Sequence, residues 1–286
     1  MVDLTLYVLQ LCVVVGLLAL AISFYTDGLG YVVLHPFALA GVGAYVFAVL
    51  ATRYQWPPIL GALAAVSSAA LSGLLCAEAI RSLRGDGLTL ATFGIGVGSF
   101  ELFRQLDITN SVFGIGSIPS LVGDGGRAWQ VGVALLALLL AAGLVRTWRR
   151  SVGGTVVAAL RMDEWGALSV GAPLVAHQRV TGLLAGAVAG LGGVYLAVTA
   201  RFVEPRDFQV SGLLVPLGAV IVAGGRTPWG VVVVAGGIVL VSQGARFVGA
   251  SPVVAGPLTE IAIAACLAAV LVFTRLRQLR RDNARG

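Results

Sequence analysis

Residues 4–24 read LTLYVLQLCVVVGLLALAISF, an apolar run without a charged residue. About 20 apolar residues in a helix span the hydrocarbon core of a bilayer, and a helix satisfies its backbone hydrogen bonds within the segment. Ala19-Leu20-Ala21 resembles a signal-peptide cleavage site, but the segment before the run carries Asp3 and no basic residue, and the run is longer than a usual signal-peptide core. We therefore expect a retained membrane helix.

The rest of the chain has the same character. Of 286 residues, 58% are hydrophobic and 11% are charged, and the mean hydropathy is +0.96. A soluble domain is close to excluded. A disulfide-stapled secreted domain is excluded too, because Cys12, Cys76 and Cys266 all lie in apolar runs. Further runs occupy residues 29–51, 58–80, 88–103, 128–147, 174–199, 212–224, 229–248 and 257–274. The sequence predicts an all-α, polytopic transmembrane bundle of about nine spans, between eight and ten, as one domain over residues 1–286.

The basic residues predict the orientation of these spans. The chain has 19 arginines and no lysine, and they lie mostly in loops, which favours a topological role over nucleic-acid binding. If the runs alternate, one side receives Arg81, Arg84, Arg146, Arg149, Arg150, Arg161, Arg226 and the basic tail 275–286. The other side receives Arg53, Arg127, Arg201 and Arg206, balanced by Asp107, Asp124, Glu204 and Asp207. Because cytoplasmic loops retain arginine, we expect a cytoplasmic C-terminus and an external N-terminus.

Two runs contain helix breakers. The second has His35-Pro36 followed by Gly41 and Gly43, and the short seventh run contains Pro216. Proline removes a backbone donor and kinks a helix, and interrupted helices often mark the pathway of a transporter. We predict one or two discontinuous helices there, with a simple packing kink as the alternative. If the second run does not cross, the side of the N-terminus reverses.

The 39 glycines form a second signal. Gly182, Gly186 and Gly190 recur at a spacing of four, and so do Gly94 and Gly98. Small residues at this spacing let helix backbones approach closely in lipid. The pattern predicts a tightly packed bundle without identifying which helices meet.

Charged side chains within the runs are few. Glu101 and Arg104 are three residues apart near a helix end, as are Glu78 and Arg81, and such pairs suit the membrane interface. Glu101 is kept as a pathway candidate because it is the deeper acid. The two histidines, His35 and His177, are far apart, so the sequence predicts neither a metal site nor a proton relay, and no catalytic motif is present. Without lysine, a phosphate-binding loop is impossible, so the energy for transport has to come from another subunit.

The longest polar interruption, residues 146–173, separates the fifth and sixth spans. Residues 156–169 are rich in helix formers, with Leu160, Glu164, Ala167 and Leu168 near one face, and Gly171 and Pro173 would end the helix. One interpretation is an amphipathic helix anchored in lipid. The other is a helix that binds a groove on a cytoplasmic partner.

The segment 158–171, AALRMDEWGALSVG, resembles the coupling helix "RALRxDExAAxxxG" of the branched-chain amino-acid type of ABC transporter permeases, with Gly166 at a family alanine. The resemblance implies that a loop over residues 151–172 couples to the ATPase. The contacting residues would be Leu160, Arg161, Asp163, Glu164, Ala167 and Gly171.

Other motifs follow in the family's order over about residues 28–250, closest to its LivM-like type. They are GVGAY (41–45), LRGDG (83–87) with ATF (91–93), FELFR (100–104), GIGSIP (114–119), VEPRDF (203–208), and GG (224–225) with WG (229–230). Two segments depart from the pattern: TNSVFGI (109–115) stands where the family has TGGPNGI, and GGRTP (224–228) stands where it has GGxGS. The first change lies in an external loop, so docking or solute choice is expected to differ.

The resemblance implies a bacterial inner-membrane permease that imports a branched-chain or other hydrophobic amino acid. Its implied partners are a second, homologous permease, two cytoplasmic ATPases that carry ATP and magnesium, and an extracytoplasmic binding protein. The chain itself would bind no cofactor and would not be an enzyme. A urea or short-chain amide importer is the alternative. From other classes, a self-sufficient channel for a small neutral solute and a structural subunit without a pathway remain open, because the sequence does not identify the solute.

Overall fold

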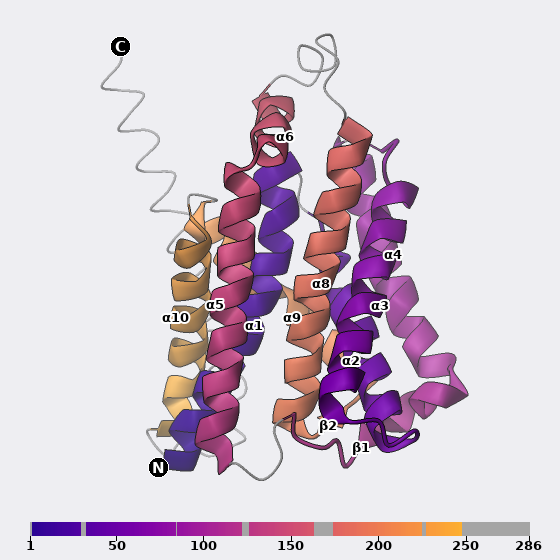
Figure 1. Ribbon diagram of the computed structural model, residues 1–286, viewed down its shortest axis with the longest axis vertical. Helices are drawn as coiled ribbons and strands as arrows, with labels where there is room; N and C mark the ends of the chain where they lie inside the picture. Colours follow the sequence, from indigo (N-terminus) through magenta and orange to yellow (C-terminus); the bar gives the residue numbers. More distant parts are fainter. Residues whose placement is uncertain are drawn as a thin grey trace.

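The backbone hydrogen bonds of this apolar chain close within a bundle of α-helices (Figure 1). The computed structural model describes residues 2–29, 33–83, 85–121, 126–162, 174–224 and 227–247. The helices in these residues are α1 (Val2–Leu29), α2 (Pro36–Thr52), α3 (Pro58–Ala79), α4 (Gly85–Gln105), α5 (Gly126–Arg150), α6 (Val152–Met162), α8 (Leu174–Ala200), α9 (Val210–Ala223) and α10 (Pro228–Phe247).

Short elements connect the helices at one end of the bundle. They are the 3₁₀ helices η1 (Asp107–Thr109), η2 (Ser111–Phe113) and η3 (Pro205–Phe208) and the strands β1 (Ile115–Gly116) and β2 (Phe202–Val203). The strands pair antiparallel, with Ile115 opposite Val203. This pairing ties the segment after α4 to the segment after α8.

Eight of the predicted runs coincide with helices, and the ninth, residues 257–274, lies outside the described residues. The count of about nine full spans is not confirmed. In the described residues, five segments are long and apolar enough to cross a membrane: Leu4–Thr26, Pro58–Ala79, Ala128–Arg150, Val175–Ala200 and Pro205–Ala223. Helix α2 and the apolar part of α10 are shorter. Helix α4 has sufficient length, but its glycines and charged residues lower its hydropathy.

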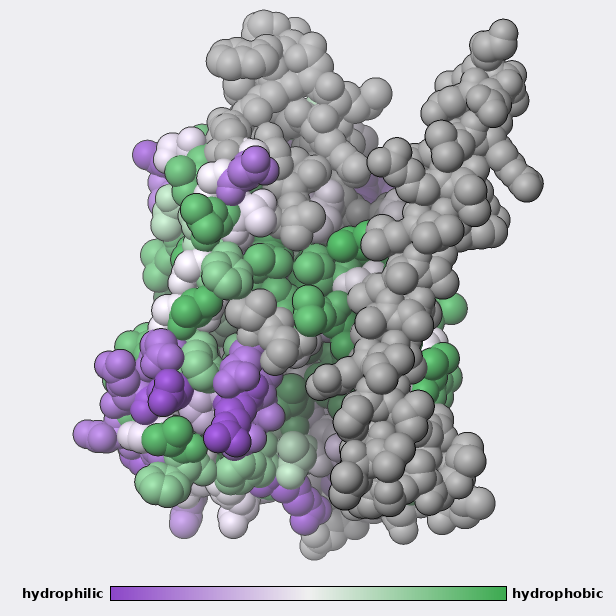
Figure 2. Space-filling model, turned by 180° about the vertical axis from the view of Figure 1, so that it is seen from behind, coloured by the Kyte–Doolittle hydropathy of each residue, from purple (hydrophilic) through white to green (hydrophobic). Residues whose placement is uncertain are grey.

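The outward faces of the helices are apolar. Leu63, Leu71 and Leu75 of α3 and Leu136 and Leu140 of α5 are among the most exposed side chains of the described residues. In Figure 2, apolar side chains fill the middle of the visible face, and hydrophilic side chains gather toward its ends. This distribution is the one expected of a multi-pass membrane protein.

Helix α8 lies at the centre, and its glycines meet two neighbours. A Cβ atom on Gly43 of α2 would lie 2.6 Å from the Cα and carbonyl oxygen of Gly190. A Cβ on Gly182 would lie 2.6 Å from the carbonyl oxygen of Gly73 on α3. A Cβ on Gly193 would collide with the carbonyl oxygen of Ala40. The glycine stripe predicted from spacing alone therefore packs against α2 and α3. By contrast, Gly94 and Gly98 of α4 have open space beside them.

The polar connections lie at two opposite ends of the bundle. At one end, Arg53 Nη2 donates a hydrogen bond to the backbone oxygen of Asp107 at 3.2 Å, near β1 and β2. At the other end, where α3 finishes and α8 begins, Arg179 Nε lies 2.7 Å from Glu78 Oε2 (Figure 1). This separation follows the grouping of loops that the arginines predict.

The close contact of α2 with α8 gives a test of the fold. We expect Gly43→Leu to lower the melting temperature of the detergent-solubilised protein strongly, or to abolish the folded state, because overpacking against backbone costs about 1–3 kcal/mol or more. The measurement is a thermal melt followed by size-exclusion chromatography. Gly94→Leu is the control, since a Cβ there meets nothing within 4 Å. Equal melting of the two variants would contradict the close packing.

Candidate functional site

Helix α2 begins inside the bundle. Its N-cap is His35, and Pro36 occupies the first helical position, where a missing N–H costs nothing. Pro36 therefore starts a helix of 17 residues and does not kink a longer one, which corrects one reading of this break. The imidazole of His35 is fully buried, and its Nε2 lies 3.1 Å from the hydroxyl of Tyr25. The N–H of Leu34 donates to Thr92 Oγ1 of α4 at 3.3 Å.

The seventh predicted run, residues 212–224, lies in α9, and the chain is interrupted ahead of it. The 3₁₀ helix η3 carries a capping box between Glu204 and Asp207, the backbone is extended at Gln209, and α9 follows over 14 residues with Pro216 inside it. Pro216 is buried. The discontinuity predicted at Pro216 is therefore not found: Pro216 lies within a continuous helix, and the break ahead of α9 was not predicted.

An aromatic cluster joins these interrupted elements. Phe103 of α4 lies 4.9 Å from Tyr45 of α2 and 6.2 Å from Phe208 of η3, measured between ring centroids. Phe37 lies 5.9 Å from Phe208. Gly41 makes room for this cluster, because a Cβ there would collide with the ring of Phe103. The structure therefore brings Gly41 beside the aromatic rings, while Gly43 faces α8.

Beside the cluster lies a small apolar cavity of about 10 Å³. Its lining residues come from the start of α2, from α4, from η3 and from α9: Leu34, Phe37, Ala38, Phe93, Gly96, Phe208 and Leu213. No charged side chain lines it. The sequence pointed to breaks at Pro36 and Pro216, but Phe93, Gly96 and Phe208 carry no local signal that would have placed them beside Phe37.

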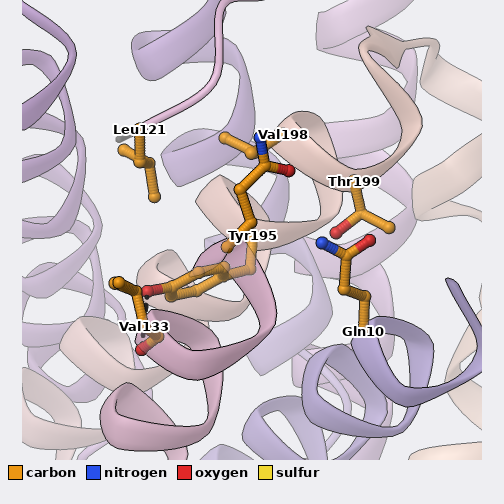
Figure 3. Close-up of a pocket in the computed structure, with 7 residues that line it drawn as sticks. Gln10, Leu121, Val133, Tyr195, Val198 and Thr199 are labelled. Carbon is orange, nitrogen blue, oxygen red and sulfur yellow. Dashed lines mark hydrogen bonds between the residues drawn. The ribbon is translucent and has the colours of Figure 1, made fainter. Parts of the chain in front are cut away.

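A second cavity of similar size lies between α1, α5 and α8 (Figure 3). Its polar lining consists of Gln10, Gln130, Tyr195 and Thr199. The side chain of Gln10 points toward Thr199, and the hydroxyl of Tyr195 donates to the backbone oxygen of Val133 at 3.2 Å. About 10 Å³ is room for one water molecule. This cavity suits a water that bridges three helices better than it suits a solute.

Glu101 pairs within its own helix. Arg104 Nη1 lies 3.0 Å from Glu101 Oε1, and both side chains are nearly half exposed. The guanidinium of Arg104 also lies over the ring of Phe100, 5.6 Å from its centroid. The predicted pair is therefore present, and Glu101 does not line any of the cavities described here.

Glu78 makes the predicted contact and a second one that sequence spacing did not indicate. Its Oε1 lies 2.7 Å from Arg81 Nη1, and its Oε2 lies 2.7 Å from Arg179 Nε on α8. The two partners engage different oxygens of one carboxylate. Because Arg179 lies 101 residues further along the chain, no local pattern could have revealed it.

The start of α8 also meets the end of α5. The rings of Trp148 and His177 lie 6.5 Å apart, and Gly153 of α6 fits against both. The hydroxyl of Ser151 accepts a hydrogen bond from the N–H of Gly154 at 3.3 Å and so caps α6. The end of α5, the start of α6 and the start of α8 thus lie side by side.

Only part of the predicted coupling segment is described. Leu160 and Arg161 lie in α6, which begins earlier than the predicted helix. Asp163, Glu164, Ala167 and Gly171 lie outside the described residues, as does the basic tail 275–286.

The end of the bundle that carries β1 and β2 has exposed apolar side chains. Phe113 is 80% exposed and Val112 is 54% exposed, next to the left-handed residues Asn110 and Ser111. Nearby, Pro57, Pro58, Ile59, Arg201 and residues 117–121 line a surface groove of about 720 Å³. Val112 and Phe113 belong to residues 109–115, where the sequence departs from the family pattern, whereas the groove residues do not.

The bridging role of Glu78 can be tested by charge exchange. We expect Glu78→Arg to lower the melting temperature of the protein, because Arg179 then faces a like charge, and the double variant Glu78→Arg/Arg179→Glu to regain more than half of the loss. Glu101→Arg is the matched control, since it breaks an exposed pair within a single helix. A double variant that melts no higher than Glu78→Arg would show that the bridge between α3 and α8 does not form.

Comparison with known proteins shows the family to which the chain is similar. Residues 4–274 match the family described as "Branched-chain amino acid transport system / permease component". The LivM permease protein of the high-affinity branched-chain amino acid transport system of Escherichia coli K12 is 27% identical over 243 residues, and its Salmonella typhimurium counterpart is 29% identical over 241. Each alignment covers 73% of this chain and 56% of the relative, so the chain spans about half the length of these proteins.

Among solved structures, PsaBC from Streptococcus pneumoniae in complex with Fab aligns with a TM-score of 0.46 and 15% identity, covering 92% of this chain and 89% of the other. The family match covers nearly the whole sequence and includes all the described helices. The chain belongs to the permease-component family of branched-chain amino acid transport systems.

Proposed function

We propose that the chain is the solute-translocating permease subunit of an ATP-driven importer of the ABC type, carrying a branched-chain or other hydrophobic amino acid. One observation carries the proposal: the end of α5 and the start of α8, which flank the predicted coupling segment, lie side by side, with the rings of Trp148 and His177 6.5 Å apart. A coupling segment flanked by two helices that meet in this way suits docking into a groove on an ATPase. Family membership supports the same reading.

The proposed partners follow from this assignment. Two cytoplasmic ATPases would hold ATP and magnesium and engage Leu160, Arg161, Asp163, Glu164, Ala167 and Gly171. A second, homologous permease would complete the pathway, and an extracytoplasmic binding protein would deliver the solute to the end that bears Phe113. The C-terminus would then be cytoplasmic, in a bacterial inner membrane.

The lining of the interior supports an apolar solute. The cavity between α2, α4 and α9 has apolar and aromatic walls. Urea and short-chain amides form hydrogen bonds on all sides, and such walls offer them no side-chain partners. Because this cavity has room for only one water molecule, a permease for urea or amides stays the alternative.

If residues 158–171 couple the permease to the ATPases, substitutions in this segment should reduce the ATP hydrolysis that solute stimulates. We expect Glu164→Arg and Gly171→Leu to leave the amount of protein in the membrane unchanged and to reduce solute-stimulated ATP hydrolysis by the complete transporter at least tenfold. The first reverses a charge at the docking face, and the second removes the glycine expected to end the helix. The measurement is ATPase activity in proteoliposomes with and without the binding protein and solute.

Val152→Glu is the control for that experiment. Val152 of α6 is 80% exposed, so the substitution adds a charge outside the predicted docking face. ATP hydrolysis that stays coupled in both test variants would remove the coupling role from residues 158–171.

Reconstitution separates the importer from a self-sufficient channel. Liposomes that contain only the purified chain are expected to show no flux of labelled leucine or urea above that of empty liposomes, because the energy source lies on other subunits. Addition of the partner permease, ATPases, binding protein and ATP is expected to start uptake. Flux through the chain alone would favour the channel. Transport by the partner permease without this chain would favour a structural subunit.

A further inference from the structure

The surface groove next to β1 and β2 lies where two candidate membrane spans end (Figure 1). Pro57 lines the groove and directly precedes the span Pro58–Ala79, and Arg201 lines it and directly follows the span Val175–Ala200. The ends of apolar spans lie where the hydrocarbon core gives way to the lipid headgroups. The groove, of about 720 Å³, is therefore at headgroup level and within the size range of small-molecule sites.

Exposed aromatic side chains mark the same level. Tyr54 is 62% exposed and Trp56 is 45% exposed, in the connection between α2 and α3. Tyrosine and tryptophan are enriched at the two surfaces of a membrane, because their rings suit the headgroup region. These two residues support the placement of the start of α3, and of the groove beside it, at the membrane surface.

The backbone of Arg201 is held in an uncommon conformation. Its φ of 53° lies in the left-handed region, which is unfavourable for arginine. Two contacts fix this conformation. The next residue, Phe202, pairs with Gly116 across the two strands, and the N–H of Ile118 donates to the carbonyl oxygen of Arg201 at 3.4 Å. The strands thus determine where the arginine side chain leaves the backbone.

The guanidinium of Arg201 has no ion pair and no hydrogen bond in the part of the chain that the structure describes. By contrast, Arg53 at the same end of the bundle donates to the backbone oxygen of Asp107, and Arg179 at the other end binds Glu78. A cation at headgroup level attracts an anion from outside the chain, and the phosphates of the surrounding lipids lie at this level.

The other walls of the groove are mainly apolar and continue into the lipid-facing surface. They consist of Pro57, Pro58, Ile59, Ile118, Pro119 and Leu121, together with Ser117 and Ser120. Ile59 is 66% exposed, and Leu63, one turn further along the same face of α3, is 60% exposed. A ligand that fits both parts has an anionic head and an apolar chain. A free anion or a hydrophilic acidic peptide would leave the face of α3 uncovered.

We propose that this groove binds one phospholipid from the leaflet at this end of the bundle. Arg201 binds the lipid phosphate, and an acyl chain lies along Ile59 and Leu63. The bound lipid joins the end of α8 to the start of α3 from outside. The proposal requires only a multi-pass membrane protein, so it depends neither on the solute nor on coupling to an ATPase.

A matched pair of arginine variants tests the phosphate contact. The measurement is native mass spectrometry of the purified chain in detergent, titrated with phosphatidylglycerol. We expect Arg201→Gln to weaken binding of the first lipid about fivefold, since one arginine at the lipid surface contributes roughly that factor. Arg206→Gln is the control, because Arg206 is exposed in η3 at the same end and does not line the groove. Equal affinity of the two variants for the first lipid would overturn the proposal.

Arg201→Gly keeps this test decisive if the glutamine variant folds poorly. Glycine adopts the left-handed conformation without strain, so this variant is expected to melt no lower than the wild type in lipid-free detergent. It is expected to lose the same factor in lipid affinity as Arg201→Gln. A folded Arg201→Gly variant that binds the first lipid as tightly as the wild type would refute the phosphate contact.

Neighbouring positions at the start of α3 test the acyl-chain contact. Ile59 and Leu60 both lie in the first turn and are 66% and 52% exposed, but only Ile59 lines the groove. We expect Ile59→Asp to weaken binding of the first lipid about fivefold or more, because the carboxylate also neutralises Arg201. Leu60→Asp is expected to change it less than twofold. An acidic residue suits the first turn of a helix, so both variants should fold. Equal losses in the two variants would show that the chain does not lie along Ile59.

Two comparisons separate a lipid from other sources of negative charge. Phosphatidylglycerol is expected to raise the melting temperature of the wild type, and inorganic phosphate at the same concentration is expected not to. Equal stabilisation by both would indicate a simple anion site and refute the lipid. A protein-docking groove would give a different result: Arg201→Gln would leave lipid binding unchanged and weaken the affinity of the binding protein for the complete transporter. That result would also refute the lipid site.

Discussion

Backbone contact between α8 and its neighbours α2 and α3 is the constraint on which the rest of the bundle depends. In lipid no hydrophobic force draws helices together, so close approach has to supply dispersion contacts directly. Glycines on all three helices permit this approach, with Gly190 against Gly43 and Gly182 against Gly73. The outer helices α4 and α10 surround this centre. The glycines of α4 meet no neighbour in the described residues, which leaves that helix less firmly held.

This central packing makes an interrupted helix possible. Backbone that is not helical is tolerated at membrane depth only where protein or a cavity surrounds it. Helix α2 satisfies this condition, since α1, α3, α4 and α8 all contact it. The residues ahead of it find partners in the hydrogen bonds from Leu34 to Thr92 and between His35 and Tyr25.

Much of the architecture could be predicted from the sequence, because the relevant physics is local. Apolar runs gave the positions of the helices, and Pro36 marked the start of the short helix α2, whereas Pro216 lies inside a continuous helix. The i,i+3 pairs of Glu78 and Glu101 formed as expected. What could not be predicted depends on contacts between distant segments. The bond from Glu78 to Arg179 and the meeting of Phe93, Phe208 and Phe37 around one cavity are set by how the helices cross. The count of about nine full spans stays a prediction, because helices such as α2 are apolar but short, and the ninth run lies outside the described residues.

The joint at the start of α8 has a mechanical consequence. His177 meets Trp148 of α5, and two residues later Arg179 binds Glu78 of α3. A force applied to one free helix would move that helix alone, whereas a force applied where three helices are joined would move all three. A force that a partner ATPase applied to the segment between α5 and α8 would thus be shared among α3, α5 and α8. Because the backbone of α8 packs directly against α2, a displacement of these three helices would also move the surroundings of α2.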